Sequence, residues 1–256
     1  MRGAKPAFPR QRLMRYFFRV EYDGTRYGGW QSQENAPSIQ DALSAAFTTV
    51  TRSECKVTGA GRTDAGVHAA GQGAHVDINA DIDAARCERS VNAVLDDDIC
   101  VYGLAPAAPD FHARYSAIGR RYRYSMALRK RPLLYKRVWM VFYDVDWDRV
   151  RANIPGLLGT HDFSAFCATG TSTNNMVCTV REASLAQERD LRVFTITADR
   201  FIYKMVRSIV GTLVDIGRGK LTATMRDIIE SKDRKAVGET APACGLVLDH
   251  VEYPQK

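Results

Sequence analysis

Hydrophobic and polar residues alternate along several short segments of this chain, while in other segments the apolar residues recur every three or four positions. The first pattern predicts β-strands and the second predicts amphipathic helices. Strands are expected at 16–22, 71–78, 99–104, 121–126, 138–143, 191–198 and 246–251, and helices at 39–50, 84–94, 147–158, 202–216 and 224–231. Residues 168–176 are expected to form a polar loop. Because strands and helices do not alternate strictly, this order favours an α+β fold over a doubly wound sheet.

Local signals set the ends of some of these elements. Ser38 and Asp41 have the spacing of a capping box at the start of a helix. Pro155 is expected to bend or shorten the helix in which it lies, because proline lacks the N–H that an internal helix position donates. Pro106 and Pro109, in a short Ala/Pro stretch, predict a linker. The chain is accordingly divided into a basic leader, an N-terminal half and a C-terminal half, at 1–15, 16–108 and 109–256.

The composition narrows the class of protein. The 256 residues are 45% hydrophobic, which is enough for a sizeable core. No apolar run approaches the ~18 residues that a membrane-spanning helix needs. The basic N-terminus lacks the apolar segment of a secretory signal, although an Arg-rich organelle-targeting peptide remains open. The six cysteines form no C-x-x-C pair, as expected for reduced, mostly buried thiols. These features predict a cytoplasmic protein with no membrane anchor.

The net charge of +7 is unevenly distributed. Residues 1–20 contain six basic residues and residues 111–143 contain nine, and neither stretch contains an acid. Aromatic residues, including Tyr122 and Tyr124, are interspersed in the second stretch. Cations that neutralise phosphates and rings that stack on bases are what a flexible nucleic acid requires. The alternative interpretation is a solvated pair of basic strands whose aromatic side chains pack inward.

One loop, Gly59–His68 (GAGRTDAGVH), has the composition of a reactive site. Its glycines permit positive φ angles and a close approach of backbone to a ligand. Arg62 lies two residues before Asp64, and a nearby arginine favours the ionised carboxylate that a nucleophile or base must present. The alternative is a glycine-rich turn in which the Asp caps backbone amides and the Arg is solvated. The loop is not a G-x-x-x-x-G-K-[ST] motif, so it does not predict nucleoside triphosphate binding.

Other chemistries find little support in the sequence. His68 and His75 do not have the i, i+4 spacing of a zinc-binding helix, which favours structural or surface roles for both. No cysteine lies in a glycine-rich turn beside basic residues, and no dinucleotide-binding fingerprint is present. If the protein is an enzyme, we therefore expect catalysis without a cofactor.

An arginine interrupts the apolar helix predicted at 202–216. On that helix Arg207 follows Tyr203 at i, i+4 and Lys204 at i, i+3. Its side chain either extends to solvent along the helix or is partly buried and needs an anion. Asp64 is the obvious candidate for that anion.

The glycine-rich loop at 59–68 closely resembles the signature of TruA-type tRNA pseudouridine synthases. Further resembling segments occur in the family's order along nearly the whole chain, at 21–24 with 29–31, 111–114, 121–124, 159–163, 205–207 with Gly211, and 245–246 with 251–253. One such motif would be weak, but seven in order are specific. The resemblance implies a mixed, largely antiparallel sheet flanked by helices and built from two similar α+β halves.

The resemblance also implies an activity and a set of residue roles. The activity would be isomerisation of uridine to pseudouridine in the tRNA anticodon stem-loop, at positions 38–40, by a homodimer without a cofactor. Asp64 would be the nucleophile, and Arg207 would pair with it. Tyr122 would stack on the target base near its C5 proton, and Arg62 would fill the space of the extruded nucleotide. Whether the carboxylate attacks the sugar or the base ring stays open.

The sequence departs from the family pattern at two positions and leaves two rival functions open. Cys167 and Cys178 stand where relatives often carry Arg, which predicts fewer RNA contacts around 160–180. A catalytically silent RNA-binding module is one rival, against which the intact set of Asp64, Tyr122 and Arg207 argues. A carboxylate-based glycosidase is the other, and it would need a second acid, for which Asp162 is a candidate.

Overall fold

The structure, a computed structural model, describes residues 13–79, 81–168 and 175–254. They form a ten-stranded sheet with the strand order β4-β1-β3-β10-β5-β9-β8-β7, to which β2 adds on β3 and β6 on β5. Only the β10–β3 and β5–β6 pairs are parallel, so this is the expected α+β fold with a mixed, mostly antiparallel sheet. The strands are β1 Met14–Tyr22, β2 Val57–Gly59, β3 His68–Ile78, β4 Ile99–Pro106, β5 Gly119–Ala127, β6 Trp139–Met140, β7 Gly159–Asp162, β8 Val177–Glu188, β9 Leu191–Ala198 and β10 Leu246–Glu252.

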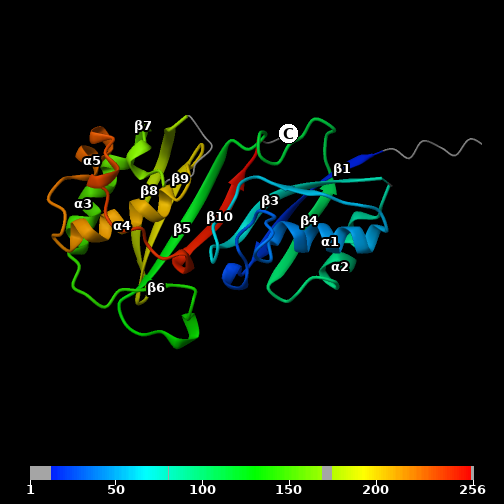
Figure 1. The fold of residues 1–256 in the computed structure, drawn as a ribbon, viewed down its shortest axis with the longest axis horizontal. Helices are drawn as coiled ribbons and strands as arrows, with labels where there is room; N and C mark the ends of the chain where they lie inside the picture. The colour runs from blue at the N-terminus through cyan, green and yellow to red at the C-terminus, as the bar shows by residue number, and fades with distance from the viewer. Residues whose placement is uncertain (1–12, 80, 169–174, 255–256) are drawn as a thin grey trace, which may run out of the picture.

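Helices cover the sheet in two separate groups. Helices α1 and α2 lie over the N-terminal strands, and α3, α4 and α5 lie over the C-terminal strands (Figure 1). Their bounds are α1 Ile39–Thr51, α2 Ala84–Asn92, α3 Trp147–Asn153, α4 Met205–Gly217 and α5 Met225–Ser231. None of the helices in the described ranges is long and apolar enough to cross a membrane.

The two groups of helices pack on the same face of the sheet, with the central strands β10 and β5 between them. Each group encloses its own hydrophobic core. Tyr122 on β5 is paired with Leu248 on β10, and its ring packs against both cores. Cross-strand partners project to the same face of a sheet. The middle of this face is therefore the junction between the halves. We call the face of the sheet that carries the helices the cleft face.

Several local predictions are confirmed at the residues that carried them. The Ser38 hydroxyl accepts a hydrogen bond from the Asp41 N–H at 3.0 Å and caps α1. Helix α3 ends at Asn153, and the proline-containing 3-10 helix Ile154–Leu157 follows it, as the position of Pro155 predicts. All six cysteines are free, but only Cys55, Cys87 and Cys178 are buried, so the expectation of mostly buried thiols holds for half of them.

Other elements differ from the expectation. The strand expected at 138–143 is reduced to the two residues of β6. Lys204 adopts the left-handed conformation, with φ of 59°, so α4 begins at Met205 instead of 202. The i, i+4 and i, i+3 relations proposed for Tyr203, Lys204 and Arg207 are therefore wrong, because the first two precede the helix. Strands β2, β7 and β8 were not predicted. Residues 169–174 of the expected loop, and 1–12 of the leader, lie outside the described residues.

Candidate active site

The glycine-rich loop that carries Asp64 connects β2 to β3 and is held by the segment after β1. Gly29 forms an antiparallel bridge with Asp64, and the Trp30 N–H donates to the Thr63 carbonyl at 3.1 Å. Gly29 has a φ of 110°, and a Cβ there would lie 2.5 Å from the Thr63 oxygen. Only glycine meets both conditions. Two motifs that are separate in the sequence thus form one backbone unit around Asp64.

A buried polar group supports the loop from beneath. The Tyr22 hydroxyl lies 2.8 Å from Thr63 Oγ1, and Gln72 Nε2 donates to the Gly61 carbonyl at 2.8 Å. Burial raises the pKa of Tyr22, so its phenol is neutral and available for hydrogen bonding. Sequence reasoning missed Thr63 and Gln72, although Thr63 adjoins Asp64 in the signature. The pattern gave no signal for Gln72, which lies on the strand predicted at 71–78 from alternation alone.

Asp64 and Arg207 come together across the cleft face. Arg207 Nη1 donates to Asp64 Oδ2 at 2.6 Å, and the two side chains are only 15% and 19% exposed. Arg207 Nε donates to the Ala241 carbonyl at 2.9 Å, which fixes the plane of the guanidinium. The structure thus contains the anion that the partly buried interpretation of Arg207 required. Asp64 Oδ1 accepts no hydrogen bond from any residue that the structure describes.

Tyr122 projects from β5 toward the same junction. Its ring meets Phe201 edge to face, with centroids 5.1 Å apart. Burial, with the charge of Asp64 adding to it, raises the pKa of Tyr122 to about 12, so the hydroxyl is protonated at neutral pH. Arg62 is exposed and forms no ion pair with the described part of the chain. The four residues expected at the site thus differ: three lie partly buried at the junction, and Arg62 extends to solvent from the same loop as Asp64.

The remaining candidates have structural surroundings. His68 Nδ1 accepts from the Gly24 N–H at 3.1 Å, and its Nε2 lies 3.0 Å from the Lys136 carbonyl. Burial lowers the pKa of His75 to about 4, and its Nδ1 accepts from the Ala113 N–H. Across 13–79, 81–168 and 175–254, no three His, Cys, Asp or Glu side chains are grouped as metal ligands. His75 is therefore a hydrogen-bond acceptor, whereas His68 accepts at Nδ1 and donates from Nε2, since a carbonyl oxygen can only accept.

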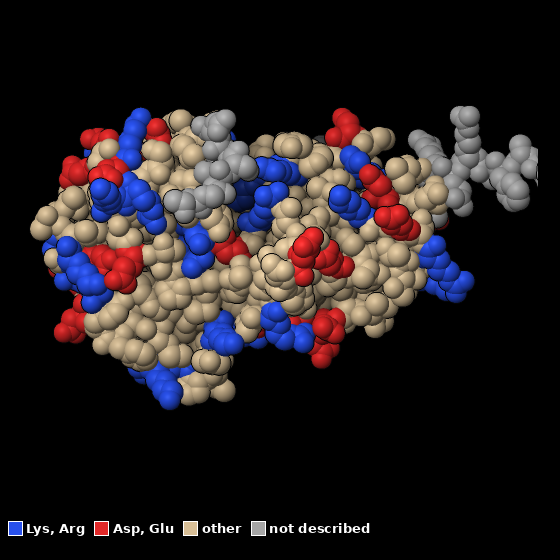
Figure 2. Space-filling view, viewed as in Figure 1, with Lys and Arg blue, Asp and Glu red and all other residues tan. Residues whose placement is uncertain are grey.

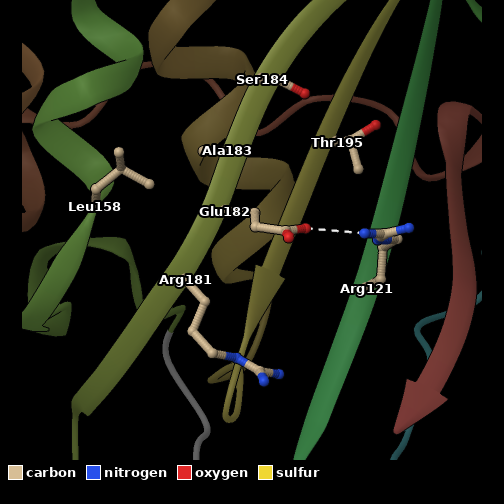
Figure 3. Close-up of a pocket in the computed structure, with 7 residues that line it drawn as sticks. All are labelled: Arg121, Leu158, Arg181, Glu182, Ala183, Ser184 and Thr195. Carbon is tan, nitrogen blue, oxygen red and sulfur yellow. Dashed lines mark hydrogen bonds and ion pairs between the residues drawn. The ribbon is translucent and has the colours of Figure 1, made fainter.

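The basic stretch 111–143 divides between the two faces of the sheet. Arg121 and Arg123 alternate with Tyr122 along β5 and so project away from the cleft face. Arg121 pairs with Glu182 and Arg123 with Glu188, each at 2.8 Å. Figure 3 shows the first pair on the side of the strands opposite α4. The two side chains line a pocket of about 450 Å³. These two arginines are not turned toward Asp64.

Elsewhere in the stretch the charges are partly offset as well. Arg129 and Arg131 both pair with Asp190, and Arg137 pairs with Asp23. On the cleft face, by contrast, Figure 2 shows a hollow near the middle of the molecule with Lys and Arg side chains in and around it. The distribution of cations, more than their number, thus distinguishes the two faces.

The structure also shows the surroundings of the two positions that depart from the family pattern, and of Asp162, the second acid that a glycosidase would need. Cys178 is fully buried in the C-terminal core, where a cation would lose its hydration. Cys167 packs against the same core and is partly exposed. Asp162 lies on β7, at the edge of the sheet, and pairs with Lys232 at 2.9 Å. It is not the second carboxylate that a glycosidase would place beside Asp64.

Comparison with known proteins agrees with this arrangement. The sequence pattern of a family described as tRNA pseudouridine synthase matches residues 19–116 and 154–254. The chain is 43% identical to tRNA pseudouridine synthase A of Porphyromonas gingivalis over 248 residues, covering 94% of this chain and 98% of that protein. It is 44% identical to the protein of the same name from Acetivibrio thermocellus over 237 residues, covering 91% of this chain and 97% of that protein. The chain therefore belongs to the tRNA pseudouridine synthase A family and is an isomerase that forms pseudouridine in tRNA.

Proposed function

We propose that the enzyme isomerises uridine at positions 38–40 of the tRNA anticodon stem-loop, with Asp64 as the nucleophile and without a cofactor. The observation that carries this proposal is the ion pair between Asp64 and Arg207, which is mostly excluded from water and leaves Asp64 Oδ1 free. A carboxylate with one oxygen paired to a cation and the other unpaired can act as a nucleophile. The positions in tRNA, and the homodimer that goes with them, rest on the family resemblance.

The reaction breaks the bond between uracil N1 and C1′ of the ribose, rotates the base and forms a bond between C5 and C1′. C5 loses a proton and N1 gains one, so no atoms are lost overall. Asp64 assists by covalent attack on the sugar or on the base ring. The Tyr122 ring offers a stacking surface for the base, and its neutral hydroxyl can relay the C5 proton.

The target nucleotide must leave its base stack before it can reach Asp64, and this costs a few kcal/mol. Arg62 extends to solvent from the same loop as Asp64. A long cationic side chain at this point is suited to occupy the space left by the extruded nucleotide. Lys and Arg around the hollow in Figure 2 supply attraction for the phosphates that flank it. With tRNA as its substrate, the proposed reaction takes place in the cytoplasm.

The test uses anticodon stem-loop transcripts with [5-³H]uridine, in which isomerisation releases tritium from C5. Three transcripts keep uridine at only one of positions 38, 39 and 40. We expect Asp64→Asn to lower the single-turnover rate by at least about three orders of magnitude while tRNA affinity stays within a few-fold. The amide keeps the size of the side chain but removes its charge and nucleophilicity. Asp162→Asn is the matched control and should retain the wild-type rate.

Each outcome separates the candidate functions. Turnover by Asp64→Asn at a rate near wild type would exclude Asp64 as the nucleophile. Binding without tritium release by the wild-type protein would favour the RNA-binding module. Release of free uracil in place of pseudouridine would indicate a glycosidase. Sedimentation of the free protein as a monomer would contradict the proposed homodimer.

A further inference from the structure

Arg120 lies next to this site, and its guanidinium has an unusual set of hydrogen-bond partners. It is on β5, two residues before Tyr122, and therefore projects to the cleft face. Its four Nη–H groups are all directed at backbone carbonyls from three different segments. Nη1 donates to Ala117 O at 3.2 Å and Asp199 O at 2.8 Å, and Nη2 to Ala60 O at 3.2 Å and Arg114 O at 3.0 Å.

No carboxylate in the described ranges pairs with Arg120. Asp199 accepts from Arg120 through its backbone carbonyl and not through its side chain. Its carboxylate accepts instead from the N–H groups of Thr179 and Arg200. Burial lowers the pKa of Arg120, which still remains charged at neutral pH. Because its Nη donors are all engaged with carbonyls, Arg120 is not organised to grip a phosphate. A partly buried cation held in this way serves to fix the backbone groups that it touches.

Two of those acceptors lie on opposite sides of the catalytic pair. Ala60 is in the loop that carries Asp64, four residues before it. Asp199 follows β9 and begins the segment that leads to Arg207 at the start of α4. Arg120 thus joins the loop of the N-terminal half to the segment of the C-terminal half. The ion pair between Asp64 and Arg207 crosses the same junction, so the two sides are connected twice.

We propose that Arg120 is a positioning residue for the isomerisation, which sets the Asp64 loop against the segment that carries Phe201 and Arg207. The inference rests on the proposed role of Asp64. An error of about 1 Å in such an alignment can cost about 100-fold in rate. The planar guanidinium is suited to this task because it directs its donors along fixed directions, whereas the ammonium of lysine does not.

The adjacent residue provides a matched control. Arg121 is on the same strand but projects to the opposite face, where it pairs with Glu182. We expect Arg120→Lys to lower the single-turnover rate of tritium release about 10-fold and Arg120→Met about 100-fold, with tRNA affinity within about three-fold. Arg121→Lys and Arg121→Met should remain within about two-fold of wild type in both measurements.

Two further measurements separate positioning from general destabilisation. Hydrogen exchange should accelerate in peptides covering 60–67 and 199–207 of the Arg120 variants, but not in those of the Arg121 variants. Arg120→Lys and Arg207→Lys should also be non-additive, with the double variant faster than the product of the single effects predicts, because both act on one alignment.

The results that would overturn the inference are distinct from those that bear on the proposed function. Arg120 variants with wild-type rates and exchange would exclude the positioning role. A loss of affinity with an unchanged rate at saturation would make Arg120 an RNA-binding residue instead. If wild-type protein releases no tritium, the proposed function fails, and the exchange measurements still decide whether Arg120 holds the two segments together.

Discussion

The two faces of the sheet use arginine in opposite ways. On the face without helices, Arg121 and Arg123 of β5 pair with glutamates of β8, and Arg181 of β8 pairs with Glu252 of β10. On the cleft face, Arg120 is held by backbone carbonyls and Arg207 by one carbonyl and Asp64. The first arrangement neutralises charge at the surface. The second arrangement positions two cations next to the residues proposed to react.

The difference in exposure gives the two arrangements different energetic weight. The Arg121 and Glu182 side chains are 42% and 61% exposed, and such a pair contributes about 0–1 kcal/mol. Arg207 and Asp64 are 15% and 19% exposed. Removal of one partner from a pair excluded from water leaves a poorly hydrated charge and can cost about 3–5 kcal/mol. Two arginines that each pair with a carboxylate therefore cannot be ranked by charge alone.

Among the tests of this comparison, the largest effect on the single-turnover rate is expected from replacement of Arg207. Arg207→Ala removes the cation beside Asp64 and should lower the single-turnover rate at least about 100-fold. Arg207→Lys should fall between Ala and wild type, because it restores the charge but not the planar fork that reaches both Asp64 and the Ala241 carbonyl. Arg121→Ala, on the opposite face, should stay within about two-fold. Full activity in Arg207→Ala would reduce the ion pair to a structural contact.

Much of the fold could be predicted because its signals are local. The alternation at β1 and the capping residues of α1 and α5 act within a few positions, and the structure retains them. Strand β8 was missed because its two ends have different surroundings: Cys178 and Val180 are buried, whereas 186–188 are exposed. The helix start at α4 depends on a left-handed residue, Lys204, which hydrophobic spacing does not reveal.

The site was predictable to a different extent. Asp64 and Arg207 could be paired in advance because a carboxylate in a glycine-rich loop and an arginine in an apolar helix each need a partner. Arg120 could not be distinguished from Arg121 by residue type. Its role follows from three carbonyl-bearing segments that only the folded chain brings together. Backbone acceptors have no signature in a sequence.

A smaller effect is expected at the hydroxyl of Tyr122. Tyr122→Phe keeps the stacking ring, worth about 1–3 kcal/mol, and removes only the proton relay, so we expect a rate about 10- to 100-fold lower at nearly unchanged affinity. Because the raised pKa of about 12 keeps the phenol protonated, its ionisation should contribute no limb to the wild-type pH–rate profile between pH 6 and 9. Wild type and Tyr122→Phe should therefore have profiles of the same shape. A limb that disappears in the variant would contradict this assignment.

The smallest effect tests whether the face without helices contacts RNA at all. Each phosphate contact adds about 0.7–0.9 to the slope of log K against log salt. Replacement of both Arg121 and Arg123 by Gln should leave the slope unchanged, because each cation has its own glutamate on the face away from Asp64. Replacement of Arg129, Lys130 and Arg131 by Gln should lower it by no more than about two contacts, since Asp190 already offsets one of the three charges.

Filter binding of the anticodon stem-loop over a range of salt concentrations measures both slopes. An unchanged slope in the triple variant would mean that residues 129–131 are turned away from the RNA. A slope that falls equally in the double variant would mean that Glu182 and Glu188 on strand β8 give way to phosphates. In that case Arg121 and Arg123 would belong to a second RNA-binding surface and would pair with glutamate only in the absence of RNA. The two faces would then differ only in their affinity for RNA.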